Sequence, residues 1–486
     1  MRRVLLSMGA IVLTIACNWD KEDRLCKDGD QPVNIIMERS KTLYSEALTG
    51  MSCEEFNSRQ TFEAPDWGSC ITTFSPGELA STQTIYTNDP IDGILSGDTI
   101  AVDESYIYSL VSRGVEITEL ESLEVKVHLP LPISPQKIFL YKDKIVVYGE
   151  RTLYITNLLG ELLFKEEMDG DQEISLKGEY LFLRSTKYID ELSDEEFCEK
   201  IIYANDARYS ALTSVREFSL EELIYLSEEH YYGARFYHLD KKRQYLGFEV
   251  PSEKGERQTA LMKKGSLELS LIEGVGVESL TMREYGEYLH LFSWDWKGGS
   301  SYYVLNSDLQ VSSRIEGIAP GEFIGAARFT PDFSYIMTYL NVDPLFVFDL
   351  KDHSGPELIG ELKFPGTPRF LHEVDTDTLI SLGVGENNQL TLSVFSVENP
   401  AVPLRTDVLT LDENGIRFDY DYKNFIFHNE NILIKGEYEY YLVWIKDHKI
   451  EKLQRIPIYG NPRTFFVDDE LLLKDGREWE SIKLND

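Results

Sequence analysis

Four side chains in the second half of the sequence have the chemistry to bind a polar ligand or a cation: Glu322, Arg328, Asp343 and His372. Carboxylates bind cations and exchange protons, arginine pairs with anions, and histidine can do either or ligate a metal. Each also has a structural explanation, because Asp343-Pro344 is a typical turn device and a lone strand histidine is usually structural. We therefore treat these residues as candidates for ligand binding and assign no catalytic residue.

Motifs of the well-known enzyme classes are missing from the sequence. It has no Gly-x-Ser-x-Gly elbow, no His-Glu-x-x-His, no Walker loop and no Rossmann glycine pattern. Asp28-Gly29-Asp30 and Asp169-Gly170-Asp171 lack the further ligands of a calcium loop, and no Cys/His cluster offers a zinc site. We expect no cofactor and no metal centre, with a structural divalent cation as the alternative that the acidic composition leaves open.

The composition is strongly acidic. Among 486 residues, 83 Asp and Glu face 48 Lys and Arg, which gives a formal net charge of −35. Such a surface repels phosphate backbones and anionic lipid headgroups, so nucleic-acid binding is excluded as a function class. The 28 tyrosines and 24 phenylalanines favour β-strands.

The N-terminus has the pattern of an export signal. Arg2 and Arg3 precede an apolar run over 4–15, which is too short to span a bilayer. The ending LTIAC at 13–17 resembles a bacterial lipobox, and this resemblance implies removal of residues 1–16 and lipidation of Cys17. We expect an exported protein whose membrane contact is this lipid anchor in the cell envelope, with the outer membrane as its location. The acidic stretch at 20–23 favours exposure on the cell surface.

Four cysteines remain after Cys17, and an even number in an exported protein predicts two disulfides. Their pairing is open among three possibilities, and we expect Cys198 to bond to one of the others. These four residues are Cys26, Cys53, Cys70 and Cys198. The first three lie in a polar extension over 17–82, which follows the signal peptide.

From residue 83 to 486 the chain repeats a unit of four short strands. Residues 135–167 contain four such strands, and the pattern recurs at intervals of about 40 residues, which indicates an all-β propeller with four-stranded blades. We expect eight blades, with seven as the alternative. The last unit has three strands, and a strand near residue 85 could complete it and close the ring.

An insert at about 188–232 interrupts this repeat. Ser193-Asp194-Glu195-Glu196 and Ser219-Leu220-Glu221-Glu222 have the spacing of helix capping boxes, so we expect a small helical insert. Because strands alternate in direction, loops between second and third strands share one face with loops between blades. We call this the upper face; it carries the insert, Asp343-Pro344 and the turns at 320–322 and 365–368.

Two stretches of the sequence carry a family resemblance. The strings RIEGIAPGEF, MTYLNVDPLFVFDL, PELIGELKFPG and LTLSVFSVENPAVP lie between 314 and 403, and YTNDPIDGILSGDTIAVDESYIYSL lies upstream. They resemble the secreted bacterial and archaeal proteins that contain a C-terminal β-propeller domain. The resemblance implies the fold and export, and it carries no reaction.

The resulting functional hypothesis is a binding or scaffolding module for a protein or carbohydrate partner at the cell envelope. The alternative is a secreted propeller enzyme, a hydrolase or lyase with carboxylates over the central channel, for which Glu322, Arg328, Asp343 and His372 would be the candidates.

Overall fold

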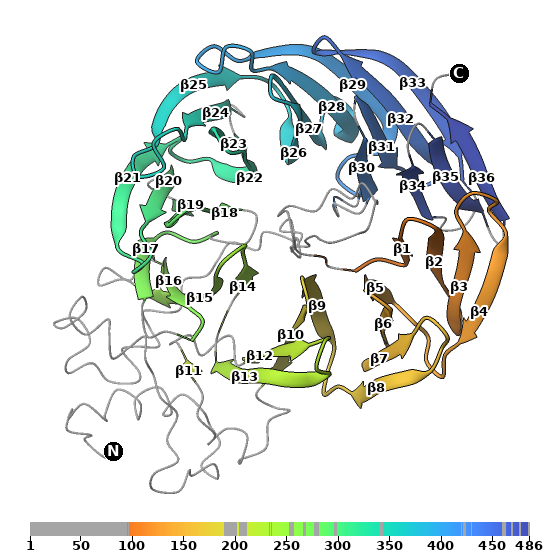
Figure 1. Cartoon of the computed structure of the whole chain (residues 1–486). Coiled ribbons are helices and arrows are strands. Elements are labelled where there is room, and N and C mark those ends of the chain that lie inside the picture. Colours follow the sequence, from red (N-terminus) through yellow and green to blue (C-terminus); the bar gives the residue numbers. More distant parts are fainter. Residues whose placement is uncertain are drawn as a thin grey trace, which may run out of the picture.

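A computed structural model of the chain describes Leu95 and most of residues 97–484. The gaps are 189–201, 204–210, 233, 235, 252–256, 266–268, 277–280, 296–298, 340–343, 419, 421–423, 429, 459–462, 468–469 and 476–477. Within these described residues, nine β-sheets stand side by side around a common centre (Figure 1). The chain is therefore an all-β propeller.

The first four blades occupy the N-terminal half of the ring. Blade 1 comprises β1 (Ile100–Val102), β2 (Tyr106–Val111), β3 (Gly114–Glu119) and β4 (Val125–Pro130). Blade 2 comprises β5 (Lys137–Tyr141), β6 (Lys144–Gly149), β7 (Thr152–Asn157) and β8 (Leu162–Glu167). Blade 3 comprises β9 (Gln172–Lys177), β10 (Tyr180–Tyr188), β12 (Ala211–Ser219) and β13 (Ile224–Tyr232), and the short β11 (Ile202–Tyr203) pairs parallel to β13. Blade 4 comprises β14 (Phe236–Leu239), β15 (Gln244–Pro251), β16 (Arg257–Lys263) and β17 (Leu269–Glu273).

The remaining five blades complete the ring. Blade 5 comprises β18 (Met282–Tyr285), β19 (Tyr288–Asp295), β20 (Gly299–Leu305) and β21 (Val311–Ile318), and blade 6 comprises β22 (Phe323–Phe329), β23 (Phe333–Tyr339), β24 (Pro344–Asp349) and β25 (Glu357–Lys363). Blade 7 comprises β26 (Thr367–Asp375), β27 (Thr378–Val384), β28 (Gln389–Ser396) and β29 (Leu404–Asn414), with a short 3-10 turn η3 (Glu386–Asn388). Blade 8 comprises β30 (Phe425–His428), β31 (Asn431–Lys435), β32 (Glu439–Lys446) and β33 (Lys449–Pro457), and blade 9 comprises β34 (Arg463–Val467), β35 (Glu470–Asp475) and β36 (Glu478–Lys483).

Tight hairpins connect the strands within a blade. Glu150 and Arg151 join β6 to β7 with φ of 49° and 56°, and Asp447 and His448 join β32 to β33 with φ of 48° and 58°. Two consecutive positive φ values are the signature of the two-residue turn whose twist matches that of paired strands. This local geometry lets each short repeat fold into a meander.

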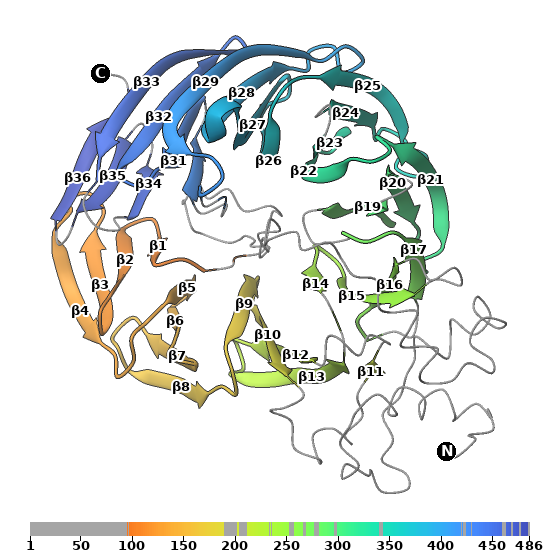
Figure 2. The ribbon, with the colours of Figure 1, turned by 180° about the vertical axis from the view of Figure 1, so that it is seen from behind.

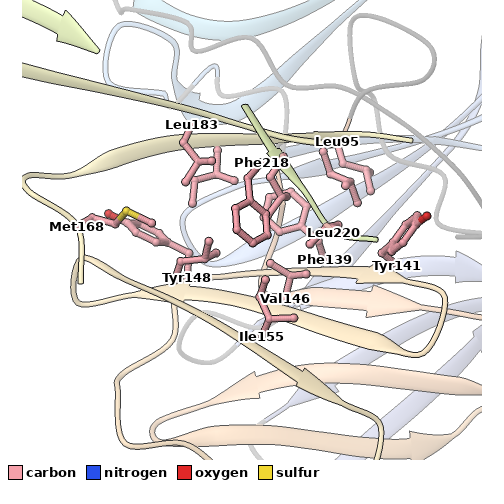
Figure 3. Close-up of a cluster of buried hydrophobic side chains, with 14 residues drawn as sticks. Leu95, Phe139, Tyr141, Val146, Tyr148, Ile155, Met168, Leu183, Phe218 and Leu220 are labelled. Carbon is pink, nitrogen blue, oxygen red and sulfur yellow. The ribbon is translucent and has the colours of Figure 1, made fainter. Parts of the chain in front are cut away.

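Buried side chains fill the spaces between neighbouring blades. Between blades 2 and 3, for example, Phe139 and Tyr148 pack with Leu183 and Phe218 (Figure 3). Burial of one large apolar side chain stabilises the fold by about 1.5–3 kcal/mol, so these layers hold the ring together.

The described residues form nine blades, so the expectation of eight, with seven as the alternative, is wrong. The missed blade comes from the region read as an interruption. Residues 211–232 form β12 and β13, which complete blade 3, and residues 236–273 then form a blade of their own.

The predicted helical insert is also wrong over 211–232. The N–H of Glu222 donates to Ser219 Oγ at 3.2 Å, and the N–H of Leu223 donates to the Ser219 carbonyl at 2.8 Å. Leu223 has a φ of 58°, so the chain reverses into β13. The contact between Ser219 Oγ and the Glu222 N–H would cap a helix in another setting. In this protein it closes the turn between two strands. The other predicted capping box, at 193–196, lies outside the described residues.

The first and last blades pack directly against each other, on the right of Figure 1 and on the left of Figure 2. Ile100, Val102 and Ile107 of blade 1 form one buried cluster with Phe465 and Leu472 of blade 9. Blade 9 has three strands among the described residues, and the strand predicted near residue 85 to complete it lies outside them.

A short segment before β1 lies on the inner side of blades 2 and 3. Leu95 exchanges two backbone hydrogen bonds of 2.7 Å with Leu176 of β9, and Asp98 forms an antiparallel bridge with Ile138 of β5. The described part of the chain includes no helix long and apolar enough to cross a bilayer.

Candidate functional site

One position recurs on the first, innermost strand of every blade. Its residue pairs with the residue seven positions later on the second strand, or eight in blade 7, where a bulge adds one residue. In blades 1 to 3 the position holds Ala101, Phe139 and Ser175, and in blades 8 and 9 it holds Ile426 and Phe465. In blades 4 to 7 it holds His238, Arg283, Arg328 and His372, which we call the basic arc.

The first member of the basic arc belongs to a buried acid–base pair. His238 Nε2 lies 3.0 Å from Asp240 Oδ2, and both side chains are fully buried. The backbone N–H groups of Lys241 and Glu284 donate to the same carboxylate at 2.7 and 3.0 Å. Burial by itself raises the pKa of Asp240, but the hydrogen bond from His238 and the positive charges of His238 and Arg283 hold it at about 2. Asp240 is therefore ionised and joins blade 4 to blade 5.

A second buried carboxylate, Glu284, continues this junction. It accepts hydrogen bonds from the Tyr245 hydroxyl at 2.7 Å, from Arg243 Nη1 at 3.0 Å and from the Lys242 N–H at 3.0 Å. Its side chain is 2% exposed. With this many donors from the neighbouring blade, Glu284 serves as a structural acceptor, not as an open acid–base group.

Between blades 5 and 6, aromatic side chains surround a buried histidine. His290 Nδ1 lies 2.9 Å from the Tyr302 hydroxyl, and its Nε2 is buried with no hydrogen-bond partner in the described part of the chain. Burial, and then the charge of His353, lowers the pKa of His290 to about 3. Tyr285 stacks on His353 with ring centroids 4.8 Å apart and donates to the Thr330 carbonyl at 2.6 Å.

Between blades 6 and 7, Arg328 acts on two side chains of β26. Its positive charge, together with the larger effect of burial, holds the pKa of His372 well below the ordinary value. Burial raises the pKa of Glu373, and the charge of Arg328 opposes that shift. The His372 ring stacks on Phe427 of blade 8 with centroids 3.6 Å apart. The basic residues of the arc thus lie next to aromatic rings and carboxyl groups.

Three of the four residues selected from sequence lie among the described residues, at two separate places. Arg328 and His372 occupy the same ring position in adjacent blades and interact electrostatically. Glu322 precedes β22, is 6% exposed, and closes a turn through its N–H to the Ala319 carbonyl at 3.1 Å. Six residues of extended strand, roughly 20 Å, separate it from Arg328. Asp343 lies outside the described residues, as do the cysteines proposed for lipidation and disulfides.

Sequence reasoning missed His238, Arg283 and Tyr285. The signal was present in the spacing, because Arg283 and Arg328 each precede their strand partner by seven positions across the first turn of a blade. Aligning blades by that turn would have placed the basic residues in one column. As for metals, the described residues contain no group of three or more His, Cys, Asp and Glu side chains that could hold an ion.

The match to a protein-family model agrees with the architecture. Residues 198–436 match the family described as Beta propeller domain. An uncharacterized protein of Methanocaldococcus jannaschii is 31% identical over 231 residues, which are 44% of this chain and 37% of that protein. An uncharacterized protein of Archaeoglobus fulgidus is 28% identical over 227 residues, with shares of 44% and 36%.

The chain thus spans less than two fifths of the length of these archaeal relatives. Among solved structures, the computationally designed Ika8 protein aligns with 71% of this chain and 95% of its own, at 10% identity and a TM-score of 0.42. The resemblance to a propeller family with archaeal members is confirmed, whereas the signal peptide and the lipobox stay predictions.

Proposed function

We propose that this protein is a binding module anchored to the cell envelope through Cys17, which presents the upper face of its ring to a protein or carbohydrate partner. The observation that supports the proposal is the direction in which the chain enters the ring. It bears on which face of the ring the chain approaches at Leu95.

The entry segment runs antiparallel to the inner strands. Leu95 pairs with Leu176, the residue before the last of β9, whereas Asp98 pairs with Ile138, the second residue of β5. Inner strands run from the upper face toward the first turn of each blade, on the lower face. The chain therefore reaches Leu95 near the lower face, rises to Asp98 and turns down into β1.

Two described turns of the upper face have a backbone geometry that glycine permits. The turn at 319–322 holds Gly321 at a φ of 82°, and the turn before β26 holds Gly366 at 131°. Arg405 Nη1 donates to the Pro365 carbonyl at 3.2 Å, which fixes the second turn against blade 7. Loops held on a rigid scaffold commonly carry binding sites.

Membrane fractionation and epitope tagging test this proposal. Cys17→Ala should move the protein from the membrane fraction to the soluble fraction. An epitope inserted after Gly366, on the upper face, should bind antibody on anchored vesicles more readily than one inserted after Gly286, in a first turn on the lower face. Equal access to both epitopes, or membrane association that survives loss of Cys17, would contradict the proposal.

A further inference from the structure

We propose that the basic arc, with Tyr285 at its middle, binds the oxyanion group of a small ligand, a carboxylate or a phosphate. This site lies on the inner strands of blades 4 to 7 and is separate from the upper-face surface. Its ligand is recognised by negative charge, which the rest of this acidic chain would repel.

The first argument is the distribution of charge. The chain has a formal net charge of −35, yet four consecutive blades place an arginine or a histidine at one ring position. The other five blades place alanine, phenylalanine, serine, isoleucine and phenylalanine there. Five blades therefore pack without a basic residue at this position. His238 is accounted for by its buried pair with Asp240, and the arginines of blades 5 and 6 need another reason.

The second argument is convergence. The positive charges of both Arg283 and Arg328 act on the Tyr285 hydroxyl. Arg283 and Tyr285 are two residues apart on β18, so both side chains leave the same face of that strand, and Arg328 holds the matching position on β22 of the next blade. Guanidinium groups bind carboxylate and phosphate through two parallel hydrogen bonds, and two of them can clamp one oxyanion.

The third argument concerns the acids beside the arc. Asp240 and Glu284 already accept hydrogen bonds from His238, Tyr245, Arg243 and backbone N–H groups. Burial raises the pKa of Glu373, which makes this carboxyl group easier to protonate when an anion approaches. Asp240 and Glu284 thus have hydrogen-bond donors besides the arginines of the arc, and a protonated Glu373 would not repel a bound anion.

The fourth argument is an available hydrogen-bonding atom. His372 Nδ1 is buried and has no hydrogen-bond partner among the described residues, although its ring is held against Phe427. A buried polar atom without a partner costs free energy, and a ligand oxygen would remove that cost.

Calorimetric titration of the full-length protein tests the proposal with three probes: galacturonate, inorganic phosphate and galactose. We expect galacturonate or phosphate to bind, with an affinity that falls as NaCl is raised, and galactose not to bind. Binding of galacturonate alone identifies the source of the oxyanion as an acidic sugar, and binding of phosphate identifies it as a phosphate group. Failure of both anions, or equal binding of galactose, overturns the proposal.

Variants locate the site. Arg283→Met and Arg328→Met should each weaken anion binding about tenfold or more, because each removes a charged donor. Arg455→Met is the matched control, since Arg455 lies on the outer strand β33 in ion pairs with Asp412 and Glu439. Arg328→Lys keeps the charge and should retain part of the affinity even where the methionine variants unfold. Equal losses in Arg455→Met would refute the arc as the site.

Discussion

Lys474 of the last blade forms an ion pair with Glu116 of the first blade, with 2.7 Å between Nζ and Oε2. The same ammonium group donates to Ser109 Oγ at 2.7 Å. The two charged side chains are 10% and 21% exposed, so solvent screens them only partly. This polar contact joins the first and last blades beside the apolar cluster between them.

Removal of this ion pair should destabilise the closed ring. We expect Lys474→Met to lower the free energy of unfolding by about 2 kcal/mol, because Glu116 would keep its charge in a partly buried place. The matched control is Lys483→Met, since Lys483 is 69% exposed and pairs with Glu470 at 3.5 Å; it should change the stability by about 0.5 kcal/mol or less. Urea unfolding measures both. Equal effects would mean that the closing pair contributes no more than a surface pair.

The entry segment depends on a glycine. Gly97 has a φ of 72°, and a Cβ there would lie 2.5 Å from Phe139 Cζ. Gly97→Ala should therefore destabilise the protein by about 1–3 kcal/mol more than Gly170→Ala, whose φ is 87° but whose Cβ would meet nothing within 4 Å. Thermal unfolding compares the two, and hydrogen exchange at the Leu95 and Leu176 amides reports release of the segment. Equal stability losses would indicate that backbone strain alone matters.

The repeating unit was predictable because its determinants are local. The alternation of apolar residues and the two-residue turns, such as Glu150-Arg151, can be recognised in the sequence of a single pair of strands. The number of blades could not be predicted in the same way. The stretch Ser219-Leu220-Glu221-Glu222 fits a helix cap and a turn between strands equally well. Pairing of β12 with β10, from Ser219 opposite Tyr180 to Ala211 opposite Tyr188, decides between them, and that pairing is remote in sequence.

Arg328 and His372 could be selected from sequence as isolated polar residues on inner strands. The position of Arg328 next to His372 could not be predicted, because it depends on the register of the strands in two blades and on the packing between those blades. The same limit applies to Glu284 and Tyr245, whose hydrogen bond joins blades 4 and 5 and has no local signature. The candidate site forms only when several blades pack together in the ring, so the sequence of a single strand does not reveal it.

The buried acceptor Glu284 gives a test of the junction between blades 4 and 5. Glu284→Gln should lower the free energy of unfolding by about 2–4 kcal/mol, because the guanidinium of Arg243 would lose a buried charged partner. Glu287→Gln is the control, since Glu287 is 64% exposed and binds the same arginine at 2.6 Å. Chemical denaturation should give a difference of at least about 1.5 kcal/mol between the two variants. A smaller difference between the two free energies of unfolding would indicate that water, and not Glu284, solvates most of the Arg243 charge.

The buried His290 should make stability depend on pH. Its pKa is lowered from 6.5 to about 3 in the folded protein by burial and then by the charge of His353, while in the unfolded chain it stays near 6.5. Below about pH 6.5 the unfolded state therefore binds a proton that the folded state does not, and stability falls with pH by about 1.4 kcal/mol per unit until the folded pKa is reached. His290→Asn should remove this contribution, so that its stability declines less steeply than that of the wild type between about pH 6.5 and about pH 4.5.

His128→Asn, at an exposed site on β4, should keep the wild-type slope. Urea titrations across this range measure the slopes, and parallel curves for all three proteins would show that His290 is protonated in the folded state.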